Sequence, residues 1–146
     1  MGILVINGPN LNMLGKREPE IYGSQSLDDI MLMCKNVADK SNVMFEHFQS
    51  NHEGQIIDFI QNEAEKYSFI IANIGAYTHT SIAIRDAFLS LTKRPNIIEL
   101  HVSNVYKREE FRHKSYISAI SIAVMCGFGS KGYLLATQFC VDEMTG

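Results

Sequence analysis

A carboxylate and an imidazole stand two residues apart in an otherwise apolar stretch of the sequence. The stretch is Asn96–His101, and Glu99 and His101 lie toward its C-terminal end. Because side chains two apart on a β-strand point to the same face, the two groups can meet there. A carboxylate in that position orients an imidazole and favours its protonated form. The pair is therefore a candidate for an oriented, protonated imidazole; the alternative is a polar pair that satisfies only itself at a strand end.

A long polar loop follows the first apolar run, Gly2–Asn7, and continues to Gly23. Loops longer than about 12 residues in compact domains are usually binding loops, lids or disordered segments. A tyrosine in such a segment is often a packing residue, but a cation five residues earlier makes a functional Tyr22 a competing interpretation. The side chains of this loop that could bind or react are Asn10, Asn12, Arg17 and Tyr22.

Two arginines, Arg108 and Arg112, stand four residues apart and would share a face on a helix. A pair of guanidinium groups suits a carboxylate or phosphate ligand. The alternative is a solvated helix on which Glu109 and Glu110 balance the positive charge.

The remaining pattern alternates apolar strands with helices, which is typical of a parallel sheet covered on both faces. Ser26 followed by Asp28 and Asp29 predicts the capped start of a helix that continues to about Ser41. Other helices are expected after His52, from Thr80 or Ser81 through Leu91, within Val102–Lys114, and from Gly129 onward. The expected strands are Gly2–Asn7, Asn42–Gln49, Phe69–Asn73, Asn96–His101 and Ser121–Phe128.

Five such strands predict an α/β, flavodoxin-like, doubly wound sheet of order 2-1-3-4-5 in one domain, residues 1–146. Ligands of open parallel sheets bind beyond the carboxyl ends of the strands. The polar side chains that seem wasteful for folding all map to that end: Asn10, Asn12, Arg17, Tyr22, Asn51, His52, Asn73, His79, Thr80, Glu99, His101, Ser103, Arg108 and Arg112.

Composition argues against nucleic-acid binding and against a membrane protein. A net charge of -3 gives no basic balance for nucleic acid, and no apolar run reaches the roughly 18 residues that a membrane span needs. We also expect no signal peptide. The three cysteines, Cys34, Cys126 and Cys140, lack a C-x-x-C pattern, which favours packing thiols in a cytoplasmic protein.

Motifs argue against a dinucleotide-binding fold built on the first strand, against a P-loop and against a serine hydrolase. The loop after the first strand has no G-x-G-x-x-G pattern, and Pro9 removes an N–H group that would cradle a phosphate. Neither a Walker A pattern nor a G-x-S-x-G elbow occurs. His79 and His101 lack the partners of a metal site, so we expect no metal.

Across nearly its whole length the chain resembles the type II 3-dehydroquinate dehydratases of the shikimate and quinate pathways. The resemblance rests on blocks that are specific in combination: NGPNLNMLGKREPEIYG (7–23), SNHEGQIID (50–58), GAYTHTSIAIRDA (75–87), ELHVSN (99–104), REEFRHKSY (108–116) and GFGSKGYLLA (127–136). It implies a flavodoxin-like fold, no cofactor or metal, and a homododecamer built from trimers. The implied substrate is 3-dehydroquinate, in the pathway of aromatic amino acid biosynthesis.

The resemblance also implies roles for individual residues. Tyr22 would be the base that removes a proton from C2 of the substrate, and Arg17 would lower the pKa of its phenol. Asn10 would help to hold a water against the enolate oxygen. His101, oriented by Glu99, would protonate the departing C1 hydroxyl.

Substrate binding and support are likewise implied by the resemblance. Asp86 would reach the site of a neighbouring subunit, and Arg108 would support the loop. The family often has a proline after the equivalent of Asn73, which would bias that residue toward an extended conformation. This chain has Ile74 instead, so the sequence does not determine the placement of Asn73. The implied substrate-binding residues are Asn73, His79, Asp86, Val102, Ser103 and Arg112.

Two other classes of function remain open from the sequence alone. One is a non-catalytic flavodoxin-like module that binds a nucleotide or acts in signalling, although Asn7 and Gly8 stand where a phospho-receiver needs acids. The other is a structural subunit of an assembly, whose polar sheet end has no chemical role.

Overall fold

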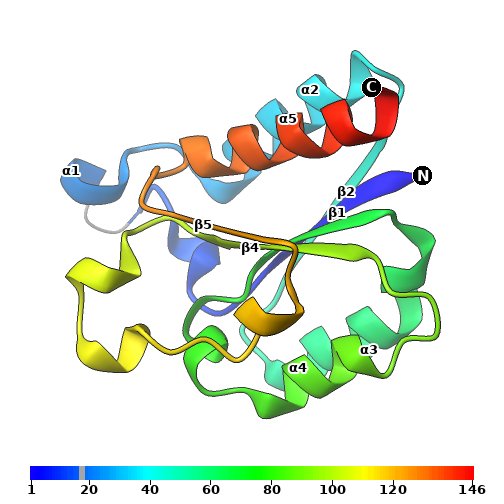
Figure 1. Ribbon diagram of the computed structural model, residues 1–146. Coiled ribbons are helices and arrows are strands. Elements are labelled where there is room, and N and C mark those ends of the chain that lie inside the picture. The colour runs from blue at the N-terminus through cyan, green and yellow to red at the C-terminus, as the bar shows by residue number, and fades with distance from the viewer. Residues whose placement is uncertain (17–18) are drawn as a thin grey trace.

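A five-stranded parallel sheet forms the centre of the protein in the computed structural model, which describes residues 1–16 and 19–146 (Figure 1). The strand order β2-β1-β3-β4-β5 confirms the predicted order 2-1-3-4-5. The strands are β1 (Gly2–Asn7), β2 (Met44–Gln49), β3 (Phe69–Asn73), β4 (Asn96–His101) and β5 (Ala123–Cys126).

Helices cover both faces of this sheet, as predicted. In Figure 1, α2 and α5 lie side by side on one face, and α3 and α4 lie on the other. The α-helices are α1 (Pro19–Tyr22), α2 (Leu27–Asp39), α3 (Glu53–Glu63), α4 (Ile82–Leu89) and α5 (Lys131–Thr145). Short 3-10 helices occupy several connections: η1 (Leu11–Met13), η2 (Ala64–Lys66), η3 (Gly75–His79), η4 (Val105–Lys107), η5 (Glu110–Arg112) and η6 (Ser118–Ile120).

The hydrophobic core is divided by the sheet into two clusters. Ile3 and Val5 of β1 pack into the cluster beneath α2 and α5, whereas Leu4 and Ile6 pack into the cluster beneath α3 and α4. Successive side chains of a strand point to opposite faces, so an all-apolar strand supplies both clusters. This double burial explains why the inner strands β1 and β3 are continuous apolar runs.

Most predicted boundaries agree with the structure, and the differences have local causes. Ser26 caps α2 in a reciprocal box with Asp29, as the sequence predicts. The chain turns through Asn42, whose φ of 56° is left-handed, so β2 begins only at Met44. The segment 75–79, predicted as a loop, winds into η3, and the fifth strand spans only Ala123–Cys126.

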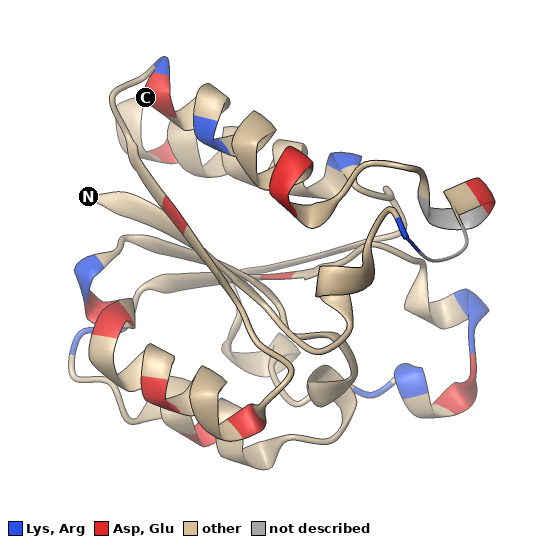
Figure 2. Ribbon diagram, turned by 180° about the vertical axis from the view of Figure 1, so that it is seen from behind, with Lys and Arg blue, Asp and Glu red and all other residues tan. Residues whose placement is uncertain are grey.

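Charged residues lie mainly on helices and loops (Figure 2). Within the five strands the charged residues are Glu46, exposed on the edge strand β2, and Glu99, which is only 2% exposed on the inner strand β4. A buried carboxylate in the middle of a sheet is costly unless it is hydrogen-bonded, so Glu99 requires partners. Among the described residues, no helix is both long enough and apolar enough to cross a membrane.

The loop after β1 is held tightly against the loop after β3. The Gly8 N–H donates to the Asn73 carbonyl at 2.8 Å, and a Cβ at Gly8 would lie 2.2 Å from the Ile74 carbonyl oxygen. Only glycine permits this approach without displacement of the backbone. The contact brings the two loops together at the carboxyl end of the sheet.

Candidate active site

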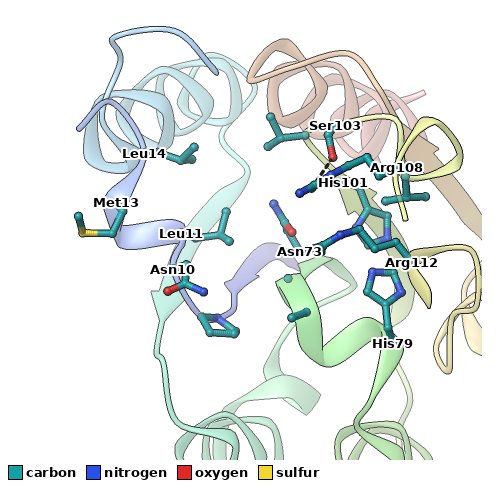
Figure 3. A pocket seen from close by; sticks show the side chains of 15 residues that line it. Asn10, Leu11, Met13, Leu14, Asn73, His79, His101, Ser103, Arg108 and Arg112 are labelled. Carbon is teal, nitrogen blue, oxygen red and sulfur yellow. Dashed lines mark hydrogen bonds between the residues drawn. The ribbon is translucent and has the colours of Figure 1, made fainter. Parts of the chain in front are cut away.

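A cavity of about 250 Å³ opens beyond the carboxyl ends of β1, β3 and β4. In Figure 3 the loop after β1 lies on one side of it, and His79, His101 and Arg108 lie on the other. Its lining residues are Pro9, Asn10, Leu11, Met13, Leu14, Asn73, Gly75, Ala76, His79, His101, Val102, Ser103, Val105, Arg108 and Arg112. The structure thus brings together side chains that are widely separated in the sequence.

Glu99 and His101 form a buried pair at the base of this cavity. The Nε2 of His101 lies 2.6 Å from Oε2 of Glu99, as expected for side chains that share one face of β4. The other oxygen, Oε1, accepts hydrogen bonds from Ser115 (2.8 Å) and Ser118 (2.5 Å). Burial raises the pKa of Glu99, but hydrogen bonds from His101, Ser118 and Ser115 outweigh it and hold that pKa below its usual value. Glu99 is therefore a carboxylate.

His79 lies beside this pair and differs from it in being uncharged. Its ring stacks on the ring of His101, with centroids 5.9 Å apart, and its Nδ1 lies 2.7 Å from the Lys114 carbonyl oxygen. A carbonyl can only accept, so Nδ1 carries the hydrogen. Burial lowers the pKa of His79, and the charges of His101 and Arg112 lower it further, against the hydrogen bond to Lys114. A neutral His79 keeps a lone pair on Nε2 for a hydroxyl donor.

Asn73 is fixed by a buried chain of hydrogen bonds. Its Nδ2 donates to the Tyr133 hydroxyl at 2.7 Å, and that hydroxyl donates to Oδ1 of Asn7 at 2.6 Å. Asn7 and Asn73 are register partners on neighbouring strands. Asn73 is extended because it ends β3 and its carbonyl accepts from Gly8, so this conformation does not need a proline in place of Ile74.

Asn10 enters the cavity from a left-handed backbone conformation, with φ of 70°. Its N–H donates to Oδ1 of Asn51 at 2.9 Å, and Nε2 of Gln49 donates to the same oxygen at 3.1 Å. Asparagine adopts this conformation more readily than most residues. Asn51 therefore holds the backbone of Asn10 and does not itself line the cavity. Asn12 is exposed on η1 and does not line the cavity either.

Arg108 and Arg112 both line the cavity, but the prediction that they share a helix face is wrong. Arg108 is extended, with φ of -111° and ψ of -164°, and separates η4 from η5. Arg108 donates to the Ser103 hydroxyl at 3.2 Å (Figure 3). Arg112 donates through Nε to Glu109 at 2.5 Å, so part of the predicted charge balance does exist. The cavity is thus lined by two guanidinium groups, of which that of Arg112 is paired with Glu109.

The remaining candidates lie away from the lining or outside the described residues. Asp86 is exposed on α4, and His52 and Thr80 are exposed and do not line the cavity. Arg17 lies outside the described residues, as does the side chain of Tyr22, whose backbone ends α1.

Comparison with known proteins connects this geometry to one family. The family model described as dehydroquinase class II matches residues 1–141. The chain belongs to the class II dehydroquinase family. As a member of this family it is an enzyme of the hydro-lyase type.

Relatives in this family match almost the full chain. The 3-dehydroquinate dehydratase of Francisella philomiragia is 56% identical over 136 residues, which cover 93% of this chain and 91% of the relative. That of Prochlorococcus marinus is 51% identical over 144 residues, covering 99% and 98%. The crystal structure of the type II dehydroquinase from Butyrivibrio crossotus superposes with a TM-score of 0.89 at 46% identity, covering 97% of each chain. These similarities agree with the flavodoxin-like fold.

Sequence reasoning missed several residues that hold the class II dehydroquinase site. Ser115 and Ser118 hold Glu99, and Tyr133 and Asn7 hold Asn73. One signal was present: a lone asparagine ends each of two neighbouring apolar strands. Nothing local to the serines or to Tyr133 indicated their partners.

Tyr133→Phe is expected to destabilise the protein by about 1–3 kcal/mol, because it leaves the buried amides of Asn7 and Asn73 without their shared partner. Urea unfolding followed by circular dichroism measures this difference. Tyr106→Phe is the matched control, since Tyr106 is 61% exposed. Equal midpoints for the two variants would contradict the importance of this network.

Proposed function

We propose that the protein dehydrates 3-dehydroquinate to 3-dehydroshikimate, with residues 1–146 acting as a single catalytic domain. The observation that carries the proposal is the buried Glu99–His101 pair, which opens into a cavity lined by amides, a hydroxyl and guanidinium groups. Loss of a hydroxyl needs a general acid, and a polyhydroxylated carboxylate needs neutral donors and a cation. Relatives named 3-dehydroquinate dehydratase, at 56% and 51% identity, support the choice of substrate.

His101 serves as the acid of this reaction. Glu99 accepts from Nε2 and stabilises positive charge on the ring, so Nδ1 is left for a group in the cavity. As the C1–O bond breaks, its electron pair leaves with oxygen, and a proton from His101 converts the leaving group to water.

The base is Tyr22, with Arg17 beside it, on the basis of the family resemblance alone. The phenolate would take a proton from C2, and the C–H electron pair would form an enolate with the neighbouring ketone. Preorganised donors stabilise such an anion, and Asn10 would hold a water against its oxygen. Return of the electron pair forms the C1–C2 double bond as the C1 hydroxyl leaves.

The other lining residues have the chemistry to bind this substrate. A neutral His79 accepts from a hydroxyl through Nε2, while Asn73 and Ser103 exchange hydrogen bonds with further hydroxyl groups. Arg112 pairs with the carboxylate next to the Val102–Ser103 backbone, and Arg108 supports Ser103. The acid and the binding residues then surround one small molecule.

Assembly completes the proposal. Asp86 lies outside the cavity of its own chain, which agrees with a role in the site of a neighbouring subunit. Ile122 and Val124, beside and on the edge strand β5, are 53% and 48% exposed, and apolar side chains of this kind are typical of contacts between subunits. A homododecamer built from trimers, as the family resemblance implies, would cover such surfaces.

An absorbance assay tests the function. On addition of 3-dehydroquinate to the purified protein, ultraviolet absorbance of a conjugated enone should grow until the substrate is consumed. Substrate without protein gives the background rate. If folded protein leaves the absorbance at that background, the proposed reaction is wrong.

A further inference from the structure

One short segment of the chain contacts both His79 and Glu99, the partner of His101. Within Lys114–Ser118, the Lys114 carbonyl lies 2.7 Å from Nδ1 of His79, and the hydroxyls of Ser115 and Ser118 donate to Glu99. The same segment is tied to the neighbouring loop, because the Tyr116 N–H donates to the Thr78 carbonyl at 2.9 Å. The segment therefore connects the immediate environments of His79 and His101.

The direction of the Ser115 hydrogen bond is fixed by its other contacts. The Ser115 oxygen accepts from the N–H groups of Ile117 (3.1 Å) and Ser118 (3.0 Å). A hydroxyl has two acceptor lone pairs and one hydrogen, so these contacts leave only the hydrogen for Glu99. Ser115 therefore acts toward Glu99 only as a donor, and the Glu99 oxygen accepts.

The three partners also fix the rotation of the Glu99 carboxylate. Both serines donate to Oε1, which leaves Oε2 for Nε2 of His101 at 2.6 Å. A carboxylate without the serines could rotate or take up a proton, and either change would release the imidazole.

We propose that Ser115 and Ser118 are positioning residues that keep Glu99 ionised and oriented toward His101, and that the Lys114 carbonyl sets the tautomer of His79. The importance of this for turnover rests on the proposed dehydration. None of the three needs to touch the substrate, since each acts through a side chain next to the cavity.

The charges around Glu99 determine what removal of a serine does. Among the groups near Glu99, the positive charge of His101 on β4 favours its ionised form. Arg112 on η5 is a second cation that lines the cavity, whereas His79 on η3, whose pKa is lowered, is neutral. Burial opposes ionisation, so loss of a donated hydrogen bond raises the pKa of Glu99. The free energy of one hydrogen bond to a charged group corresponds to a change of about one unit in the pKa of that group.

Ser118→Ala is the cleanest variant, because the Ser118 hydroxyl donates to Glu99 and the substitution leaves the backbone bonds of Ser115 in place. The acidic limb of its kcat profile should move to higher pH by about one unit, with KM nearly unchanged. Ser115→Ala should move the limb in the same direction. Ser121→Ala is the control, since Ser121 donates at 2.7 Å to the Ile117 carbonyl and not to Glu99. Profiles of Ser118→Ala and Ser121→Ala that overlay would overturn the inference.

A titration without substrate separates this inference from the function. The ¹³C shift of the Glu99 carboxyl, followed by NMR, should give a higher pKa in Ser118→Ala than in the parent protein and in Ser121→Ala. If the parent fails to dehydrate 3-dehydroquinate but this pKa rises, only the proposed function falls. If the parent is active and the pKa of Glu99 is the same in all three proteins, the role of the serines is wrong.

Discussion

Replacement of His101 by alanine is expected to lower turnover by about 10²–10⁴-fold while the protein stays folded, which is the usual contribution of an acid catalyst. His101 ends β4, lines the cavity and has Nε2 committed to Glu99. Alanine removes the proton donor and leaves the carboxylate of Glu99, which Ser115 and Ser118 still hold. The loss should therefore fall on kcat more than on KM.

The measurement is steady-state kinetics together with the thermal unfolding midpoint of each variant. His47→Ala is the matched control, because His47 is an exposed histidine on β2 that does not line the cavity. A His101→Ala enzyme within a factor of about ten of the parent would assign the acid to another group.

Tyr22→Phe is expected to reduce turnover to the background rate, because the ring remains but the base is lost. An ordinary tyrosine has a pKa near ~10, so only about one molecule in a thousand carries phenolate at neutral pH. A guanidinium at Arg17 would favour the phenolate, and exclusion of water from a closed loop would strengthen that attraction. The backbone of Tyr22 closes α1, and Gly23, with φ of 84°, follows it.

The corresponding measurement is kcat of Tyr22→Phe beside Tyr106→Phe, which makes the same change on an exposed ring. Arg17→Ala should lower kcat more than it raises KM, because the guanidinium acts on the reacting state. Near-normal turnover in Tyr22→Phe would show that the base lies elsewhere.

The sequence was sufficient for the fold where short-range patterns determine it. Strands β1, β3 and β4 were predicted with their observed bounds, because each is a mainly apolar run that ends in a polar residue. The start of α2 followed from its own capping residues. Strand β5 was predicted too long because Ser121, Ile122 and Gly127 continue its pattern without pairing in the ladder.

The candidate site was predictable only in part. The pairing of Glu99 with His101 could be predicted, because side chains two residues apart on a strand point to the same face. The hydrogen-bond partner of Asn73 could not be predicted in this way, since Tyr133 is 60 residues away in the chain. The helical spacing of Arg108 and Arg112 was misleading, because the extended backbone of Arg108 divides that segment into two short turns.

In the proposed mechanism, Tyr22 removes the C2 proton and His101 protonates the leaving hydroxyl in a separate step. Hydrogen exchange at C2 of 3-dehydroquinate tests this two-step mechanism directly. Each variant is incubated with the substrate in D₂O, and loss of the C2 proton signal is followed by NMR. His101→Ala should still exchange this proton while dehydration fails, whereas Tyr22→Phe should lose both. Exchange that disappears equally in His101→Ala would contradict His101 as the acid of a separate elimination step.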